Sequence, residues 1–366
     1  ALSHAQTGGR FETYSVGYDR PGYSEWDYVR SMVAHTGLSC REIRLNEEAY
    51  PDTWQMLVSR KGLPISTPNE IAIYHLSRAA RERLTVVLSG EGADEVFGGY
   101  VVPYFSAFDY DRAPRQPLPP NAVMEPGYAA LRRLYGREHI YCRPDHYFLT
   151  NAWVPFADKA RLISPAFKDL ISNDDELFTW YEDAYAPFRD CTTFHANMQV
   201  HARVNLEGLL FRVDSSTMSA SIEARVPFTD HRIVEHLFKL PDHLKMAWRS
   251  PEAQHRARDL NIADIDRLDL VESKILLRKA FSDLLPGDVL SRRKASFPVP
   301  FREGFHDWLS ALPPGVLQDS QILRQLFSSS GIEQLLQNAG HKRSAMLLWP
   351  IVNLALWEQA CSVTLP

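Results

Sequence analysis

SGEGADEVFGGY, at residues 89–100, is the stretch of this 366-residue chain that decides its fold. A largely apolar run at 84–88 precedes it and predicts a strand buried on both faces of a sheet. A predicted helix follows, so backbone N–H groups come to lie at the carboxyl end of a parallel strand, where α/β sheets bind phosphates and nucleotides. Gly90 and Gly92 let the backbone turn tightly and approach such a ligand without a Cβ in the way.

Three acidic residues in this stretch need a further explanation, because Glu91, Asp94 and Glu95 repel a bare phosphate. A magnesium ion resolves the conflict, since it binds carboxylate and phosphate oxygens together. The alternative is a glycine turn whose acids stabilise a helix N-terminus, and the spacing alone does not separate the two interpretations.

Short apolar runs alternate with amphipathic stretches through residues 1–100, as in a parallel sheet flanked by helices. Strands are predicted over 11–17 and 41–45, ahead of the strand at 84–88. The fold class predicted from this alternation is α/β.

Two predicted helices begin with capping signals. Ser24 and Asp27 resemble a capping box, and apolar residues at helical spacing extend this helix to about His35. The run TPNE at 67–70 combines an N-cap, a proline at the first helical position and a glutamate three residues after the cap. A second helix is therefore predicted from there to about Arg83.

Composition and periodicity divide the chain into three predicted parts. Residues 1–105 are expected to form a nucleotide-binding α/β core, and 106–195 a connecting region rich in proline and aromatic residues. Residues 196–366 are expected to be mainly helical, with a proline-containing break at 294–304. The connecting region holds Pro114, Pro117, Pro119, Pro120 and Pro126.

The bulk composition is that of an ordinary folded domain, with 45% hydrophobic and 23% charged residues. The net charge of -5 gives no electrostatic reason to expect a nucleic acid or an anionic membrane as partner. The longest apolar runs fall short of the roughly 20 residues that a membrane span needs.

The cysteines and histidines form no recognisable metal or redox motif. The four cysteines lie far apart without a CxxC pair, which makes a reducing, cytoplasmic compartment the default expectation. The first residues also lack the basic start and apolar stretch of a signal peptide.

The run at 89–100 resembles the SGEGADE(V/L)FGGY signature of asparagine synthetases and their relatives. Four further segments are similar to motifs of this family and occur in the family's order. They are SVGY at 15–18, Met218 with EARVPF at 223–228 and Asp230-His231, KILLRKAF at 274–281, and RRK at 292–294 with Phe297 and Pro300. The resemblance covers roughly residues 11–305, with a weaker likeness near Trp349 and Trp357.

The resemblance implies a fold of the ATP-pyrophosphatase (adenine nucleotide alpha hydrolase-like) type, with a parallel sheet, helices on both of its faces and a helical C-terminal elaboration. It implies a ligase that works in two steps. The side-chain carboxylate of aspartate attacks the α-phosphorus of ATP to give an acyl-adenylate and pyrophosphate, and ammonia then displaces AMP. ATP and Mg2+ are the implied cofactors.

The implied partners are small molecules: ATP, aspartate or another carboxylate, and ammonia derived from glutamine. A glutaminase domain is expected upstream in the full-length chain, and a homodimer is left open. No nucleic acid and no membrane is expected as a partner.

The resemblance assigns four residues to ATP. Ser89 and Gly90 are expected to contact the AMP portion, largely through the backbone, and Glu91 to lie beside them. Val16 is expected at a strand end next to the adenine, with a plain core β-residue as its alternative.

The resemblance also assigns the chemistry. Glu91 is expected near the reacting acyl carbon, where it orients ammonia or takes a proton during its attack. Asp94 is expected to help hold magnesium, and Lys294 to offset negative charge as pyrophosphate departs. The plainer alternatives are helix-capping acids and a solvated loop lysine.

Glu223 and Arg225 are interpreted as a structural pair, with a substrate-side role as the alternative. Alternate residues on an extended segment face the same side, which brings the two side chains together.

Two parts of the usual family enzyme do not occur in this sequence, the glutaminase domain and the SGGxDS loop that binds the pyrophosphate end of ATP. In relatives that loop lies just before a helix that enters a strand like 11–17, and residues 1–5 resemble the remainder of that helix. We therefore interpret the sequence as an excerpt of a longer protein, inactive by itself.

Smaller departures leave the acyl substrate open. Thr229 stands where the family usually has leucine, Ser296 where it often has glycine, and 214–218 keeps the length but not the middle of a common DRMSM run. β-Lactam synthetases, lasso-peptide cyclases and other amide-forming relatives share the scaffold and remain alternatives. A degenerate, non-catalytic binding module is a further alternative, although the retained acids and Lys294 argue against it.

Overall fold

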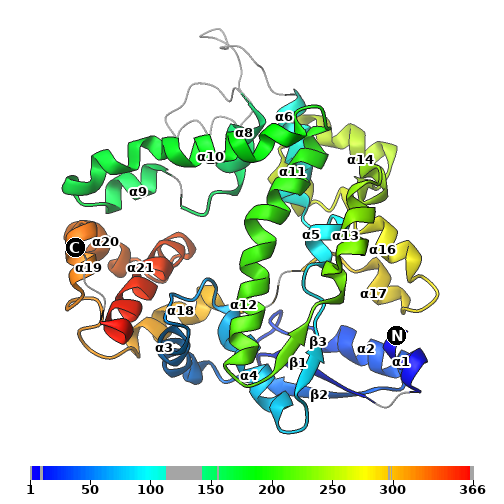
Figure 1. Ribbon diagram of the computed structural model, residues 1–366, viewed down its shortest axis with the longest axis horizontal. Helices are drawn as coiled ribbons and strands as arrows, with labels where there is room; N and C mark the ends of the chain where they lie inside the picture. The colour runs from blue at the N-terminus through cyan, green and yellow to red at the C-terminus, as the bar shows by residue number, and fades with distance from the viewer. Residues whose placement is uncertain are drawn as a thin grey trace. The chain divides into compact units, whose positions relative to one another are not determined.

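The computed structural model describes residues 2–8, 11–112, 142–154, 156–295, 297 and 299–362. These residues form two compact units, each assembled from separate segments of the chain. Unit 1 comprises Ala1–Ser89, Gly208–Arg225 and Ala280–Pro366, and unit 2 comprises Gly90–Glu207 and Val226–Lys279. Figure 1 labels the helices and strands of both units.

Unit 1 holds four short strands and most of the longer helices at the two ends of the chain. Its strands are β1 (Glu12–Gly17), β2 (Ser39–Arg44), β3 (Val86–Leu88) and β4 (Glu223–Arg225). Its helices are α1 (Leu2–Thr7), α2 (Trp26–Thr36), α3 (Tyr50–Lys61), α4 (Asn69–Arg81), α12 (Glu207–Met218), α17 (Gly287–Ser291), α18 (Phe301–Ser310), α19 (Gln321–Leu326), α20 (Ser329–Gln337) and α21 (Lys342–Cys361).

Unit 2 is mainly helical. Its strands are β5 (Met246–Trp248) and β6 (Val271–Ser273). Its helices are α5 (Ala93–Phe97), α6 (Val101–Arg112), α8 (Arg143–Asn151), α9 (Phe156–Leu162), α10 (Asp175–Tyr185), α11 (Thr193–His201), α13 (His231–Phe238), α14 (Pro251–Arg256), α15 (Ile262–Arg267) and α16 (Ile275–Ala280), with a π-helix at Ala202–Leu206.

The described strands pair as three two-stranded sheets. β1 pairs with β2 in parallel, from Glu12 opposite Ser39 to Gly17 opposite Arg44. β3 pairs with β4 in parallel, and β5 pairs with β6 in antiparallel orientation. The structure is thus a mostly helical α/β fold with small sheets, and the three strands predicted in the first part of the chain are confirmed.

The predicted burial of the strand before the glycine-rich stretch is wrong. Val86 and Leu88 of β3 are 48% and 65% exposed. β3 is only three residues long and pairs with β4 alone among the described strands, so it lacks the cover that a central strand of a large parallel sheet receives.

The predicted capping box of α2 is also wrong, although the helix itself is confirmed. Its N-cap is Glu25, which makes no side-chain capping bond, because the helix begins one residue later than a cap at Ser24 requires. The C-terminal end is conventional: Gly37 adopts φ 70° and donates its N–H to the carbonyl of Val33 at 2.8 Å.

The start of α4 is stabilised by the glutamate of the TPNE run and not by its threonine. Pro68 occupies the N-cap position without a side-chain bond. Glu70 reaches back instead, and its Oε1 accepts the backbone N–H groups of Ser66 at 2.6 Å and Thr67 at 3.4 Å. Only the glutamate half of the predicted capping signal is therefore used.

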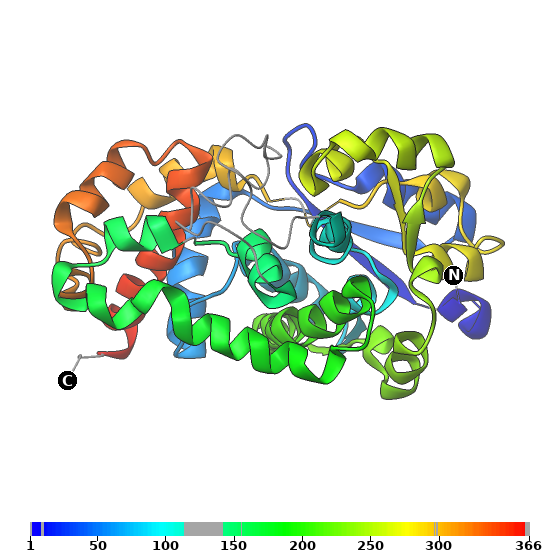
Figure 2. The same cartoon turned by 90° about the horizontal axis from the view of Figure 1, so that it is seen from above.

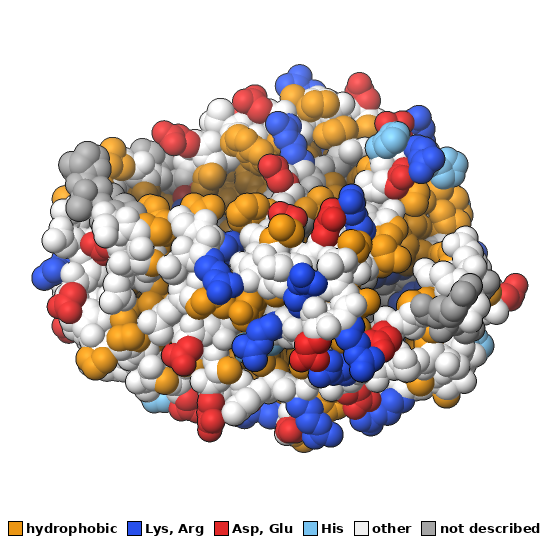
Figure 3. Space-filling model, turned by 60° about the horizontal axis from the view of Figure 1, so that its bottom comes forward, with side chains coloured by type: hydrophobic (Ala, Val, Ile, Leu, Met, Phe, Trp, Pro, Cys, Tyr) orange, Lys and Arg blue, Asp and Glu red, His pale blue; other side chains and the backbone are white. Residues whose placement is uncertain are grey.

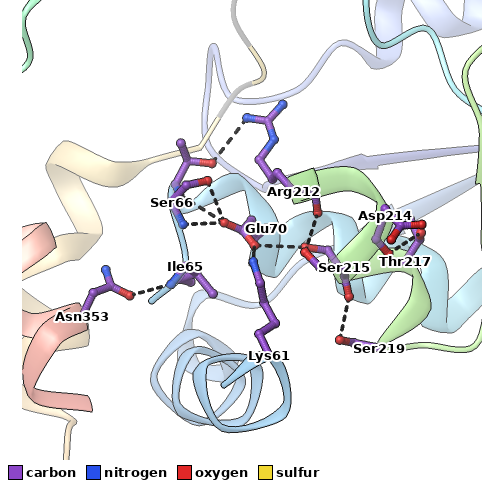
Figure 4. Close-up of polar contacts among 12 residues, drawn as sticks. Lys61, Ile65, Ser66, Glu70, Arg212, Asp214, Ser215, Thr217, Ser219 and Asn353 are labelled. Atoms are coloured by element: carbon purple, nitrogen blue, oxygen red, sulfur yellow. Dashed lines mark hydrogen bonds and ion pairs between the residues drawn. The ribbon is translucent and has the colours of Figure 1, made fainter. Parts of the chain in front are cut away.

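Glu70 also forms a buried ion pair with Lys61, at the end of α3 (Figure 4). Their side chains are 0% and 4% exposed, respectively. The Oγ atoms of Ser66 and Ser216 donate to Glu70 at 2.9 and 3.3 Å, so helices α3, α4 and α12 meet around one carboxylate. Such a charge is tolerated in the interior because several donors surround it.

The apolar core of unit 1 joins α3 to α21, which lie side by side in Figures 1 and 2 although they stand near opposite ends of the sequence. Trp54 and Trp349 stack with ring centroids 4.3 Å apart. The Oδ1 atom of Asn353 accepts from the indole of Trp54 at 2.9 Å and from the backbone of Ile65 at 3.1 Å. The indole of Trp357 donates to the carbonyl of Gly62 at 2.8 Å, so α21 fixes the loop between α3 and α4.

The core of unit 2 is a cluster of buried apolar residues from α6, α11, α15 and β6, among them Tyr104, Met198, Ile265 and Val271. Pro114, Pro117, Pro119, Pro120 and Pro126 lie outside the described residues, and the predicted division into three parts stays a prediction.

The face shown in Figure 3 carries basic and acidic side chains interspersed with apolar ones. Unit 1 has several exposed ion pairs, including Arg30–Glu42 at 2.8 Å. None of the helices that the structure describes has the length and apolar character that crossing a membrane requires.

Candidate active site

The glycine-rich stretch begins at the end of β3. The N–H of Ser89 donates to the carbonyl of Arg225 at 2.8 Å, which continues the β3–β4 ladder by one residue. The backbone of Ser89 is therefore fixed by the strand pair that precedes the turn.

Gly92 needs to be glycine for two reasons. Its φ is 86°, a left-handed conformation that other residues rarely adopt. A Cβ at this position lies only 2.3 Å from Cγ2 of Thr229, within unit 2. Thr229, noted above as a departure from the family's usual leucine, therefore packs directly beneath the turn.

Glu95 differs from Glu91 and Asp94 in being buried. It is 1% exposed, and its Oε1 accepts from the amide of Asn205 at 3.1 Å. Loss of water around the carboxyl raises the pKa of Glu95 above its ordinary value, and the nearby charges of Asp94 and Glu91 raise it further. A buried carboxyl whose pKa is raised is a poorer ligand for a metal that arrives from solvent than a partly exposed one.

Asp94 is only partly buried and forms an ion pair that sequence reasoning missed. The ammonium of Lys274 lies 2.8 Å from its Oδ1, and the two side chains are about equally accessible, with Asp94 21% and Lys274 22% exposed. Lys274 itself was visible in the sequence as the first residue of the KILLRKAF segment. Nothing in the local sequence indicates with which acidic residue it forms an ion pair.

The absence of a side chain at Gly99 makes room for this pair. A Cβ there lies 1.8 Å from Oδ1 of Asp94 and 2.6 Å from Cε of Lys274. The second glycine of the FGG run is thus required by the contact between the acid and the lysine.

Lys294 lies in unit 1, in the segment after α17. Its side chain is partly exposed, and its ammonium donates to the carbonyl of Ala295 at 3.0 Å. Arg292, two residues earlier, forms an ion pair with Glu25 and lies 4.3 Å from the ring centre of Tyr28, which attaches this segment to α2. Ser296 lies outside the described residues.

The remaining predicted residues of unit 1 lie on its two parallel strand pairs. Val16 is 7% exposed on β1, opposite Ile43 of β2, so its side chain is buried. Glu223 and Arg225 of β4 form an exposed ion pair at 2.7 Å, which is the contact predicted from their alternate spacing.

The predicted residues fall into two groups, and the boundary between the units passes through the motif itself. Unit 1 holds Val16, Ser89, Glu223, Arg225 and Lys294, and unit 2 holds Gly90, Glu91 and Asp94.

The asparagine synthase family model matches residues 1–359. The chain belongs to the asparagine synthase family. Its ATP-pyrophosphatase class accounts for a turn of this kind directly after a parallel strand.

Curated relatives of the chain are named asparagine synthetases. The chain is 26% identical over 356 residues to asparagine synthetase [glutamine-hydrolyzing] 1 of Bacillus subtilis, covering 95% of this chain and 52% of the relative. It is 24% identical to asparagine synthetase [glutamine-hydrolyzing] 3 of the same organism, covering 93% of this chain and 49% of the relative. It is 25% identical to a putative asparagine synthetase of Mycobacterium bovis, covering 91% of this chain and 45% of the relative. The chain spans about half the length of the curated relatives it matches.

Proposed function

We propose that this chain carries the ATP-dependent amide-forming site of an asparagine-forming ligase. The family match supports the reaction class, and the turn at 89–94 after a parallel strand pair is the observation that carries the site. In the first step an oxygen of the aspartate side chain bonds to the α-phosphorus, and the bond from that phosphorus to pyrophosphate breaks. In the second step ammonia bonds to the acyl carbon, AMP leaves, and the nitrogen loses a proton.

The nucleotide is assigned to the ends of β1 and β3. Val16 offers its backbone beside the adenine, and Ser89 and Gly90 offer theirs to the AMP portion. The burial of the Val16 side chain supports recognition through the backbone there, and the N–H of Ser89, already donated to Arg225, leaves the carbonyl of Ser89 for the ligand. In this proposal the two parallel strand pairs of unit 1 belong to one parallel sheet with helices on both faces.

Asp94 is the residue that fits a divalent cation. Its carboxylate supplies hard oxygen ligands and follows the turn assigned to the nucleotide, and its side chain is 21% exposed although Oδ1 is buried. A magnesium ion held by Asp94 would neutralise negative charge on the phosphates. Glu95 is left out of the ligand set because it is buried and protonates more readily.

The remaining roles concern charge and proton movement. Glu91 orients ammonia or accepts its proton at the acyl carbon. Lys294 offsets the charge that develops on the departing phosphates, and the attachment of Arg292 to α2 supports a defined position for this segment. The exposed pair of Glu223 and Arg225 lies along β4, the strand that pairs with β3, and is assigned a structural role.

Glutamine is the proposed source of ammonia, since the relatives are named glutamine-hydrolysing, and a glutaminase domain in the same full-length protein is the proposed supplier. The four free cysteines support a reducing, cytoplasmic compartment as the place of action. A homodimer stays a prediction.

The deciding experiment measures pyrophosphate and AMP released by the full-length protein with Mg-ATP, ammonium and a panel of carboxylates. Aspartate is expected to give the fastest release. Faster release with another carboxylate assigns the protein to a different amide-forming reaction, and no release with any of them leaves a non-catalytic binding module.

A further inference from the structure

Lys274 places a positive charge on the carboxylate that we assign to the metal. Its ammonium lies 2.8 Å from Oδ1 of Asp94. A divalent cation at the same oxygen is repelled by an ammonium at this distance, so the two cations compete for one ligand.

The backbone around Lys274 aims its side chain at Asp94. Lys274 adopts φ 54°, which is uncommon for a residue other than glycine. Its N–H donates to the carbonyl of Gly98 at 3.2 Å, and the N–H of the next residue, Ile275, donates to the backbone carbonyl of Lys245 at 3.2 Å. The residue is thus fixed on both sides at the start of α16, opposite the gap that Gly99 leaves.

The pair is nevertheless open to exchange. Both side chains are about one-fifth exposed, unlike the buried pair of Lys61 and Glu70, although Oδ1 of Asp94 is buried and the exposed area lies on its other side-chain atoms. Ion pairs with access to water are weak and are broken readily by a better partner. The contact therefore holds the carboxylate in place without locking it.

We propose that Lys274 pairs with Asp94 while no metal is bound. When a metal ion binds together with the nucleotide, the ion replaces the ammonium of Lys274 at this carboxylate. The inference rests on the proposed role of Asp94 as a metal ligand. A single carboxylate that already faces an ammonium binds metal poorly, whereas the phosphates of a nucleotide add oxygen ligands that favour the metal. Lys274 is thus a positioning residue that makes metal binding depend on the nucleotide.

The test is a titration of the nucleotide-free, full-length protein with Mn2+, which takes the same oxygen ligands as Mg2+, with free Mn2+ measured by electron paramagnetic resonance. Lys274→Met keeps the length of the side chain and removes its charge. It is expected to tighten Mn2+ binding about tenfold or more, because a unit charge next to the ligand is lost. Lys274→Arg keeps the charge and is expected to bind Mn2+ as weakly as the wild type.

The matched control is Lys239→Met, which removes the same charge from an exposed lysine of unit 2 and is expected to leave Mn2+ binding unchanged. Asp94→Asn combined with Lys274→Met is expected to abolish the gain. Thermal melting of each variant reports whether it is folded, and Lys274→Gln replaces Lys274→Met if the latter is not.

Equal Mn2+ affinity of wild type and the folded, uncharged variant overturns the inference, as does a gain that survives Asp94→Asn. These outcomes are separate from a failure of the proposed function. If Mg-ATP and aspartate still yield pyrophosphate, the ligase stands without this role of Lys274, and if they yield none, the ligase itself fails.

Discussion

Asp94 and Glu91 stand three residues apart and are assigned different tasks, which makes their variants separable. Asp94→Asn removes a charged metal ligand, so its loss of pyrophosphate release is expected to be partly restored by raising magnesium. Glu91→Gln changes a group assigned to the acyl carbon and is expected not to respond to magnesium. Initial rates of the two full-length variants over a magnesium series test this, and identical magnesium profiles contradict the assignment.

Lys294 is expected to matter more for chemistry than for binding, because charge builds on the phosphate oxygens only as pyrophosphate leaves. Lys294→Ala in the full-length protein is expected to lower synthetase turnover on the order of 100-fold or more. Lys294→Arg is expected to be impaired as well, since a planar guanidinium does not replace a compact ammonium.

Glutamine hydrolysis provides the internal control for Lys294, because the proposal places it in another domain. Pyrophosphate and glutamate release are measured together for the wild type and both variants. Near-normal pyrophosphate release from Lys294→Ala contradicts the proposed role and leaves Lys294 as a solvated loop lysine.

Glu95 gives the stability of the protein a pH dependence of known sign. Burial raises the pKa of this carboxyl in the folded state above its unfolded value. The folded state therefore binds the proton more tightly, so the stabilisation is full below the unfolded pKa and is lost as pH rises through the folded pKa. Glu95→Gln stays neutral and is expected to gain stability relative to the wild type over that window. Urea unfolding from about pH 4 to pH 8 checks this, and a difference that is constant with pH contradicts it.

At the scale of single elements, the strands and helices near the motif were predictable because each is specified by its own residues. β1 and β2 follow from short apolar runs, and α2 from apolar residues at helical spacing. Capping was less predictable, since Glu70 accepts the N–H groups of Ser66 and Thr67 while the cap predicted from the side chain of Thr67 does not form.

Contacts between elements were not readable from the sequence. The pairing of Asp94 with Lys274 joins two segments that local patterns do not connect, and the exposure of Val86 and Leu88 depends on which strands lie beside β3. The motif resemblance identified candidate site residues, but it did not predict that the ammonium of Lys274 pairs with Asp94.

The buried pair of Lys61 and Glu70 joins three helices of unit 1 and gives a test at this scale. Lys61→Met leaves an unpaired carboxylate in the interior and is expected to cost about 3–5 kcal/mol of unfolding free energy. Adding Glu70→Gln is expected to recover part of that loss, because the amide is uncharged and its oxygen still accepts from Ser66.

Urea unfolding of the single and double variants measures this coupling. Arg41→Met is the matched control, since Arg41 and Glu82 form a pair at 2.5 Å whose side chains are 45% and 59% exposed. Its expected cost is at most about 1 kcal/mol. Additive losses from Lys61→Met and Glu70→Gln contradict the account of a coupled pair.

At the scale of the whole molecule, each unit is built from segments far apart in the sequence. Its stability therefore depends on contacts between early and late segments of the chain. In unit 1 this role falls to α21. The ring of Trp349 stacks on Trp54, and its indole donates to the carbonyl of Ser66 at 3.1 Å, which ties the last helix to the loop before α4.

Trp349→Ala is therefore expected to destabilise unit 1 by about 3–5 kcal/mol, the usual range for removing a large buried aromatic side chain. Trp153→Ala is the control, because Trp153 is 61% exposed and a surface substitution is expected to stay within about 0.5 kcal/mol. Since the two units need not unfold together, pulse proteolysis in urea, with fragments assigned by mass, is the suitable measurement. It follows cleavage in the unit 1 segments separately from cleavage in unit 2. If Trp349→Ala exposes unit 1 no earlier in the urea series than Trp153→Ala does, α21 does not carry the closing contact that its packing indicates.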